Sequence, residues 1–338
     1  MVHADPPHEE VFPGIWRVPI AIPVPLRYVN SYLIEGDAGW TVVDAGHHTP
    51  QAEARWEQVL GELGIGFADI EQIVVTHYHP DHIGCAGWLQ QRCHAPVLIL
   101  DKELPQVERF WDGGSDAGEA IEAQFVRHGV PGEVTRQLPA HHLQQVAMVH
   151  PLPRLTPLAE GSRIRVGRRS FEVLWTPGHS EGLLVLWEPD ERLLVADDLI
   201  LRPITPNISL WPHSRINPLI EYLRSLERVQ QLPARLVLPG HRHPIEDLAR
   251  RIDELRAHHR ERLDRVEAIV SARAAAADGR GDLLATAWDV QLQLFGPQPE
   301  LIGTRFAVAE ALSHLEWLVE HGRLRHAVEE PVIRYAPA

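Results

Sequence analysis

Residues 76–82 read THYHPDH, which places three histidines and one aspartate within six positions, directly after an apolar run. Side chains alternate along a strand, so His77 and His79 at a strand end share one face. If a helix begins at the proline, Asp81 and His82 turn toward a neighbouring point, and an acid in the first turn suits the helix dipole. Imidazole and carboxylate together suit Zn²⁺, Fe or Mn²⁺. The stretch therefore predicts four ligands divided between two adjacent metal positions.

Three later apolar, strand-like runs also end in a side chain that can bind metal. These side chains are His179, the neighbouring pair Asp197 and Asp198, and His241. The carboxyl ends of strands form the edge at which α/β sheets usually place their sites, so we expect the signals to meet there. One such residue alone is more often an ordinary turn residue, and with 21 histidines in the chain some will cluster by chance. Four such signals in one chain favour a metal site.

Strand-like and helix-like patterns alternate along most of the chain before His241. Helical periods lie at Gln51–Leu63 and Ile83–Arg92. The strand-like runs are Tyr28–Ile34, Trp40–Val43, Ile73–Thr76, Val97–Leu100, Arg163–Val166, Ser170–Trp175, Leu183–Trp187, Leu193–Ala196 and Leu236–Leu238. Repeated alternation, with strands in both halves, predicts an α/β layer fold.

Two segments depart from this alternation. Residues 101–148 show amphipathic helices at Val107–Trp111 and Ala120–His128, separated by Gly113–Gly114, and no strand pattern, which predicts a helical insertion. After His241 come three helical periods and two short strand-like pieces, the order of a winged helix: Ile245–Val270, Leu284–Leu294, Phe306–His321, Leu324–Ala327 and Val332–Tyr335. We expect a first domain over residues 10–250, with the insertion at about 101–148, and a helical, winged-helix-like domain over residues 251–338.

Taken in order, these motifs resemble those of the metallo-β-lactamase-fold hydrolase superfamily, over roughly residues 10–245. They are H-x-H-x-D-H, T-P-G-H-S, an acid that ends a strand, and P-G-H. The resemblance implies an αββα sandwich with a dinuclear metal site between its two sheets. It implies that one metal is held by His77, His79 and His179, and the other by Asp81, His82 and His241. One acid of the pair Asp197 and Asp198 would bridge the two metals.

We take Asp197 as the bridging acid because the family pattern is Gly-Asp-x-Leu, and residues 196–199 read Ala-Asp-Asp-Leu. Alanine in place of the glycine leaves Asp198 as the alternative. Asp44, in Val-Asp-Ala-Gly, matches a family acid that orients a ligand histidine from behind. Asp81 and Asp197 are the predicted catalytic residues. The implied cofactors are two divalent ions, zinc first, with iron or manganese as alternatives.

Two metals about 3.5–4 Å apart can share a water and lower its pKa toward about 7, which generates hydroxide at neutral pH. That hydroxide is expected to attack an acyl carbon whose carbonyl oxygen one metal polarises. The full ligand set resembles the glyoxalase-II-like (hydroxyacylglutathione hydrolase) and thioesterase-like branches, so a thioester of coenzyme A or glutathione is the first expectation. The alternatives are a lactone or other ester, a metallo-endoribonuclease activity, and a non-catalytic relative that binds a ligand.

Several side chains are candidates for the substrate pocket. Phe110, Trp111 and Phe125 belong to the helical insertion, which could cover the metals and hold an acyl chain. Packing against the sheet alone explains their apolar character equally well. Thr205 and Asn207 lie in the loop that follows the bridging acid and could donate a hydrogen bond to a substrate carbonyl.

The charge balance argues against nucleic acid as a partner. The 32 basic and 46 acidic residues give a formal net charge of −14. In the would-be recognition helix, residues 304–321, Arg305 is the one Lys or Arg, and it is opposed by three glutamates. We expect this module to pack on the first domain, to shape the pocket or to mediate dimerisation, so a homodimer is considered. The expected partner is a small acyl substrate.

The first residues, Met1 to Val11, are polar and show no basic region followed by an apolar one. No apolar run approaches the roughly 18–20 residues that a membrane span needs. We therefore expect a cytoplasmic protein without a membrane partner. Cys85 and Cys93 fall in one predicted helix, so no disulfide is expected.

Overall fold

A computed structural model of the chain describes residues 6–24, 26–112, 116–214, 216–280, 283–328 and 330–338. Gly113 and Gly114, predicted to separate two helices, lie outside these residues, as do the first five residues of the chain. By its internal contacts the chain forms two compact units. The sheet unit comprises Met1–Ser115, Gln144–Pro206 and Arg228–Arg251, and the helical unit comprises Asp116–Leu143, Asn207–Glu227 and Ile252–Ala338. The domain boundary predicted at residue 250 stays a prediction.

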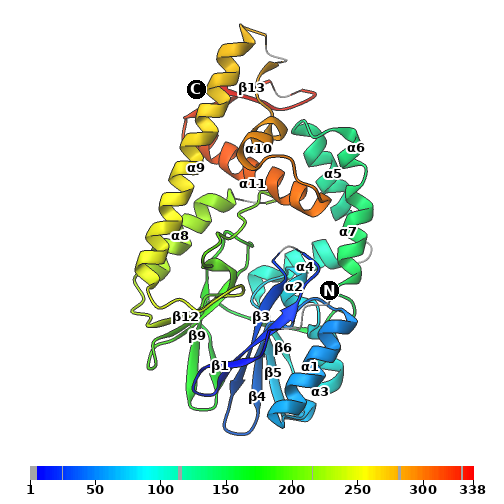
Figure 1. Ribbon diagram of the computed structural model, residues 1–338, viewed down its shortest axis with the longest axis vertical. Coiled ribbons are helices and arrows are strands. Elements are labelled where there is room, and N and C mark those ends of the chain that lie inside the picture. Colours follow the sequence, from blue (N-terminus) through cyan, green and yellow to red (C-terminus); the bar gives the residue numbers. More distant parts are fainter. Residues whose placement is uncertain (1–5, 25, 113–115, 215, 281–282, 329) are drawn as a thin grey trace. The chain divides into compact units, whose positions relative to one another are not determined.

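The sheet unit contains two β-sheets (Figure 1). The first has the order β1 (Glu9–Phe12), β2 (Ile15–Ala21), β3 (Tyr28–Glu35), β4 (Trp40–Val43), β5 (Ile70–Val74), β6 (Val97–Leu100) and β7 (Leu155–Leu158). The second has the order β12 (Leu236–Leu238), β11 (Leu193–Val195), β10 (Leu184–Glu188), β9 (Arg169–Trp175) and β8 (Arg163–Val166). Strands β4 to β7 are parallel to one another, as are β11 and β12, and the other pairs are antiparallel. The predicted α/β fold is confirmed.

One apolar core joins the inner faces of the two sheets. Tyr32 and Ile34 enter it from β3, and Phe171 and Val173 enter it from β9. Each pair is two residues apart, because side chains of a strand point alternately to its two faces. The intervening Leu33 is also fully buried. Strand β3 is therefore buried on both faces, and the helices α1 (Pro50–Leu63) and α3 (Ala86–Cys93) contact strands β2 and β5 of the same sheet.

Local sequence sets both ends of α1. The Thr49 side chain accepts a hydrogen bond from Ala52 N (3.1 Å), which satisfies one of the free N–H groups of the first turn. Pro50 follows at the position where its missing N–H does no harm. Gly64 ends the helix with φ +70°, a left-handed conformation that favours glycine.

The carboxyl ends of the parallel strands meet at one edge of the sheet unit, because parallel strands share a direction. Backbone and side-chain bonds join loops of the two sheets there. These bonds run from Leu184 N to Thr76 O (3.1 Å), from Asn30 N to Gly240 O (2.7 Å) and from Tyr32 Oη to Pro239 O (2.7 Å). The segment that follows β5 is thereby fixed to β10 of the second sheet, and the segment that follows β12 is fixed to β3 of the first.

The helical unit holds helices and a two-stranded hairpin. The helices α9 (Leu248–Ala277), α10 (Ala287–Phe295) and α11 (Leu301–Glu320) and the hairpin of β13 (Leu324–Val328) and β14 (Arg334–Pro337) follow one another in the predicted order. The unit also includes α5 (Ala117–Arg127), α6 (Gly132–Thr135) and most of α7 (Leu138–Ala147) and α8 (Pro218–Gln230). Most of the second half of the predicted insertion therefore belongs to the helical unit by its contacts. The likeness to a winged helix stays a prediction.

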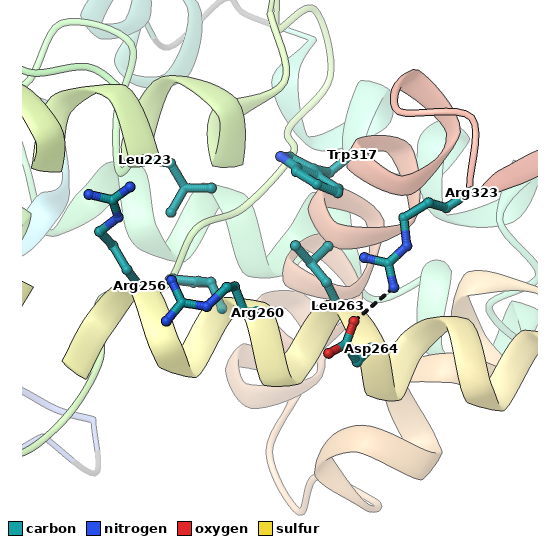
Figure 2. A pocket seen from close by; sticks show the side chains of 8 residues that line it. Leu223, Arg256, Arg260, Leu263, Asp264, Trp317 and Arg323 are labelled. Carbon is teal, nitrogen blue, oxygen red and sulfur yellow. Dashed lines mark hydrogen bonds and ion pairs between the residues drawn. The ribbon is translucent and has the colours of Figure 1, made fainter. Parts of the chain in front are cut away.

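A cavity of about 370 Å³ lies in the helical unit, among side chains of α8, α9 and α11 (Figure 2). It is lined by Leu223, Arg256, His259, Arg260, Leu263, Asp264, Trp317 and Arg323. Arg323 donates a hydrogen bond to Asp264 Oδ1 (2.8 Å). None of these residues is a predicted ligand or substrate contact.

The structure also bears on membrane spans and on the two cysteines. In the described ranges, no helix combines the length and the apolar character that crossing a membrane requires. Cys85 and Cys93 are both free, as predicted, and Cys85 Sγ donates to His47 O (3.2 Å).

Two helical glycines provide a matched test of this packing. A Cβ at Gly87 in α3 would lie 1.8 Å from Pro151 O, whereas a Cβ at Gly61 in α1 would meet no atom within 4 Å. We expect Gly87→Ala to lower the free energy of unfolding by about 1–3 kcal/mol, since backbone must move. Gly61→Ala should raise it by about 0.5–1 kcal/mol, because alanine favours the helix. Urea denaturation followed by tryptophan fluorescence measures both, and equal effects in the two variants would contradict the packing of α3.

Candidate metal centre

Five histidines and four aspartates gather at the carboxyl-end edge of the sheet unit. Their nitrogen and oxygen atoms form four overlapping groups, in each of which all ligand atoms lie within 4.8 Å of one another. The groups are His77–His79–His179, His77–His82–Asp198, Asp81–His82–His241 and Asp44–His82–Asp197. All seven predicted ligands belong to this cluster, together with Asp44 and Asp198.

The chain turns at His79, as the sequence predicts. Strand β5 ends at Val74, and the short helix α2 (Pro80–Ile83) begins with Pro80 in its first turn and His79 as its N-terminal cap. His82 N donates to His79 O (2.9 Å) and closes the turn. This change from extended to helical backbone sends His77 and His79 in one direction and Asp81 and His82 in another.

His77, His79 and His179 form the first candidate metal position. His77 Nε2 lies 2.9 Å from His79 Nδ1. The ring centroid of His179 lies 5.0 Å from that of His77 and 4.6 Å from that of His79. Three imidazoles that converge in this way match the nitrogen ligands that zinc accepts.

Asp81, His82 and His241 form the second candidate position, and Asp198 joins it to the first. Asp81 Oδ2 lies 3.4 Å from His241 Nε2 and 3.7 Å from His82 Nε2. Asp198 Oδ2 lies 3.5 Å from each of these two Nε2 atoms. The same oxygen lies 3.3 Å from His179 Nε2 in the first group. Asp198 is therefore within reach of both positions.

Asp197 lies on the Nδ1 side of the histidines, so the sequence-based choice of Asp197 as the bridging acid stays a prediction. Its Oδ2 accepts a hydrogen bond from Thr76 Oγ1 (2.6 Å) and lies 3.1 Å from His77 Nδ1. Its Oδ1 lies 3.5 Å from His82 Nδ1. Asp197 thus faces the Nδ1 atoms, on the far side of these two rings from the Nε2 atoms. The sequence cannot decide between Asp197 and Asp198, because the two are neighbours and only the backbone determines which one points to which side.

The backbone at Asp197 directs the side chains of the two neighbouring aspartates to different sides of the histidines. Its φ is +46°, in the left-handed region that favours glycine and that aspartate and asparagine tolerate. Asp197 therefore has a backbone conformation that suits the glycine of Gly-Asp-x-Leu. Gly240, in Pro-Gly-His, allows the close approach, because a Cβ there would lie 2.4 Å from Asp198 Oδ1 and 2.5 Å from Asp197 Oδ1.

Asp44 lies on the Nδ1 side of His82 and contacts Thr76, the residue before the first ligand. Its Oδ1 accepts a hydrogen bond from Thr76 N (2.8 Å), and its Oδ2 lies 2.8 Å from Thr76 Oγ1 and 3.1 Å from His82 Nδ1. The Thr76 hydroxyl thus links the two carboxylates of Asp44 and Asp197. Such contacts fix ring orientation and tautomer. Burial and the neighbouring Asp197 carboxylate raise the pKa of Asp44 to about 6.

Burial and the neighbouring charges set the protonation of the cluster. Burial and neighbouring imidazoles hold the pKa values of His77 and His79 well below the usual range, so both are neutral at pH 7, as ligands must be. Burial opposes a proton on His241, but Asp198 and Asp81 outweigh it and raise its pKa to about 10. Burial likewise opposes the charge on Asp198, yet His241 and His82 hold its pKa well below the usual range.

Two polar atoms of the cluster lack a hydrogen bond in the part of the chain that the structure describes. His82 Nε2 and Asp198 Oδ1 are buried and form no hydrogen bond with any described residue. Buried polar atoms are nearly always satisfied, so an unsatisfied pair in one cluster indicates a missing ligand. The donor set, the neutral histidines and these two atoms together fit two divalent metal ions.

The predicted substrate contacts fall in different places. Phe110 stacks on Tyr78, with ring centroids 5.0 Å apart, and Trp111 Nε1 donates to Tyr78 O (2.6 Å). Thr205 is half-buried in the sheet unit. In the helical unit, Phe125 is fully buried, and Asn207 donates to Glu310 Oε2 (2.7 Å). Their contact with a substrate stays a prediction.

Glu103 is a buried acid near the ligands that no sequence pattern indicates. It follows β6 in the short turn Asp101–Glu103, where its residue type suits a helix start. The side chain is fully buried, and burial raises its pKa to about 7. Its partners come from two distant loops, which the local sequence cannot show.

Comparison with known proteins agrees with the geometry. Residues 24–241 match the Metallo-beta-lactamase superfamily domain, and residues 282–338 match the Metallo-beta-lactamase-like, C-terminal domain. The structure of a metallo-beta-lactamase family protein from Thermus thermophilus superposes with a TM-score of 0.84 at 36% identity, covering 97% of this chain and 100% of that one.

Two curated relatives cover most of the chain. The probable metallo-hydrolase YqjP of Bacillus subtilis is 28% identical over 312 residues, 89% of this chain and 91% of YqjP. The atrochrysone carboxyl ACP thioesterase of Aspergillus fumigatus is 23% identical over 286 residues, 83% of this chain and 72% of the thioesterase. With the domain match, the fold and the convergent His and Asp side chains, the chain belongs to the metallo-beta-lactamase superfamily of hydrolases.

Proposed function

We propose that the protein hydrolyses a thioester with two divalent metal ions, zinc first. The observation that carries the proposal is the position of Asp198 Oδ2, which lies 3.3 Å from His179 of the first group and 3.5 Å from His82 and His241 of the second. A carboxylate between two ligand groups keeps two cations close to each other. When bound, such a pair supplies hydroxide at neutral pH and polarises the carbonyl of the substrate.

The residues of the chain have separate tasks in this centre. His77, His79 and His179 would hold one ion, and Asp81, His82 and His241 the other. Asp198 would contribute to both. Asp44 and Asp197 contact the Nδ1 atoms of His82 and His77, so they hold these rings with Nε2 directed to the ions.

A thioester is the proposed substrate class for two reasons. A thiolate leaves without first accepting a proton, which suits a cluster whose neutral histidines are all used as ligands. In addition, a relative that aligns over 83% of this chain is named as a thioesterase of an acyl carrier protein, although it is only 23% identical. The proposed substrates are therefore acyl groups on coenzyme A, on glutathione or on a carrier protein. A cytoplasmic location, a homodimer and the absence of a nucleic-acid partner stay predictions.

Release of free thiol tests the substrate class. A panel of acyl-CoA, acyl-glutathione and N-acetylcysteamine thioesters is incubated with zinc-loaded protein, and thiol is detected with a chromogenic disulfide. We expect turnover of at least one thioester, and none after the ligand substitution His79→Ala. If the protein hydrolyses lactones or oxygen esters on a parallel panel and releases no thiol from the thioesters, the substrate is an ester and the thioester proposal is wrong.

Metal removal tests the cofactor. Protein purified without chelator should contain close to two divalent ions per chain by elemental analysis. Dialysis against a strong chelator should remove both and abolish hydrolysis, and zinc should restore it. The metal-free protein should also unfold at a lower temperature, because burying these carboxylates without cations is costly. A purified protein that is folded, active and free of metal would refute the proposal.

The neighbours Asp197 and Asp198 form a matched pair of variants. Asp198→Asn removes a charged ligand of both ions, so we expect about one ion per chain and activity below detection. Asp197→Asn keeps an oxygen that accepts from Thr76, and asparagine tolerates a positive φ. It should keep two ions and lose no more than about 10–100-fold in activity. The opposite ranking of the two variants, measured by elemental analysis and by kcat/KM, would assign the bridge to Asp197.

A further inference from the structure

Glu103 joins two loops that carry metal ligands. Its carboxylate is fully buried. Oε1 accepts a hydrogen bond from Tyr78 N (2.9 Å), and Oε2 accepts one from Gly182 N (2.5 Å). Each oxygen thus serves a different loop, one after β5 and one after β9.

The two loops held by Glu103 supply all three histidines of the first metal position. Tyr78 lies between His77 and His79 in the sequence, and Gly182 lies three residues after His179. The loops are far apart in the chain, so no local turn relates them. A bidentate carboxylate with one loop on each oxygen sets their separation, and with it the distance between the histidines.

The fit around Glu103 is tight. A Cβ on Gly182 would lie 2.4 Å from Glu103 N and 2.5 Å from its Oε2, so only glycine allows this approach. On the other side of Tyr78, Trp111 Nε1 donates to Tyr78 O (2.6 Å). Glu103 immediately precedes α4 (Leu104–Trp111), and Trp111 is its last residue. One short segment therefore holds both the N–H and the C=O of Tyr78.

The cost of Glu103 argues for a role beyond packing. A buried carboxyl is expensive unless it is paired or fully hydrogen-bonded. Within the described residues no Arg, Lys or His forms an ion pair with it, and the backbone N–H groups of Tyr78 and Gly182 help to offset the cost. An apolar residue would fill the same space more cheaply, but it could not fix two N–H groups.

We propose that Glu103 is a positioning residue that sets the geometry of the His77–His79–His179 metal position. The proposal rests on the metal centre proposed above. It predicts an asymmetry between the two positions. Asp81, His82 and His241 receive their support from other contacts, such as Asp44 to His82 and His241 Nδ1 to Tyr28 O (2.8 Å), so their position should respond less to loss of Glu103.

The test is stepwise Co²⁺ binding to the metal-free protein and to Glu103→Gln. The amide keeps one accepting oxygen but turns an NH₂ group toward an N–H donor, so one of the two loops is released. Visible absorption follows the geometry of bound Co²⁺, and competition with a chromophoric chelator gives two affinities. Glu108→Gln, an exposed acid on α4, is the matched control. Spectra of His79→Ala and His241→Ala identify each position.

We expect Glu103→Gln to weaken one of the two affinities by about 10–100-fold, the range known for residues that orient metal ligands. With one equivalent of Co²⁺ bound, the absorption spectrum of Glu103→Gln should match that of His79→Ala, in which only the second metal position remains intact. Glu108→Gln should match the parent. Trp111→Phe, a milder change that removes the donor to Tyr78 O, should shift the same affinity by a smaller factor.

Three results would overturn the proposal. Unchanged affinities and spectra in Glu103→Gln would show that the contact has no influence on the metals. An equal loss at both positions, together with a lower melting temperature, would show general support of the fold. A parent protein that binds no Co²⁺ would refute this proposal and the metal centre together. In contrast, a parent that binds two ions and cleaves no thioester would refute only the proposed substrate.

Discussion

The rest of the structure depends on one constraint: four carboxylates and five imidazoles are brought together, seven of the nine side chains buried and His79 and Asp81 partly exposed. An unpaired buried charge costs several kcal/mol, so such a cluster is stable only when every charge has a partner. The Nδ1 atoms of His77 and His82 have Asp197 and Asp44, which Thr76 links. On the Nε2 side, the buried atoms His82 Nε2 and Asp198 Oδ1 form no hydrogen bond within the described residues. That imbalance is the physical reason to place cations there.

The fold meets this constraint through the direction of its strands. Parallel β4, β5 and β6 in one sheet, and parallel β11 and β12 in the other, end at a common edge. Each ligand follows a strand whose apolar residues fill the core, so the packing that stabilises the sheets also positions the ligands. Glycines at 182 and 240 then allow backbones to approach carboxylates more closely than a side chain would permit.

Much of this was predictable, and the failures have identifiable causes. The runs Trp40–Val43, Val97–Leu100 and Arg163–Val166 are predicted with the bounds observed for β4, β6 and β8, because they alternate or are apolar throughout. Strand β2 was missed since Arg17 and Pro19 interrupt its pattern. Pro19 is tolerated because it lies beyond the part of β2 that pairs with β1.

The candidate site, too, could be predicted from the sequence only in part. Histidines and acids that end apolar strands are visible in the sequence, and all seven predicted ligands meet in one cluster. Which of two adjacent aspartates faces the Nε2 atoms and which faces the Nδ1 atoms depends on a positive φ at Asp197, which composition does not reveal. Glu103 has no motif at all, because its role is created by two loops that only the tertiary structure brings together.

The central claim is that Asp198 stands between two metal positions. A crystal structure of zinc-loaded protein, with anomalous diffraction measured on both sides of the zinc absorption edge, tests it most directly. The account predicts two anomalous peaks about 3.5–4 Å apart, with a carboxylate oxygen of Asp198 coordinating both and Asp197 behind the histidines. A single peak, or two peaks joined by Asp197, would contradict it.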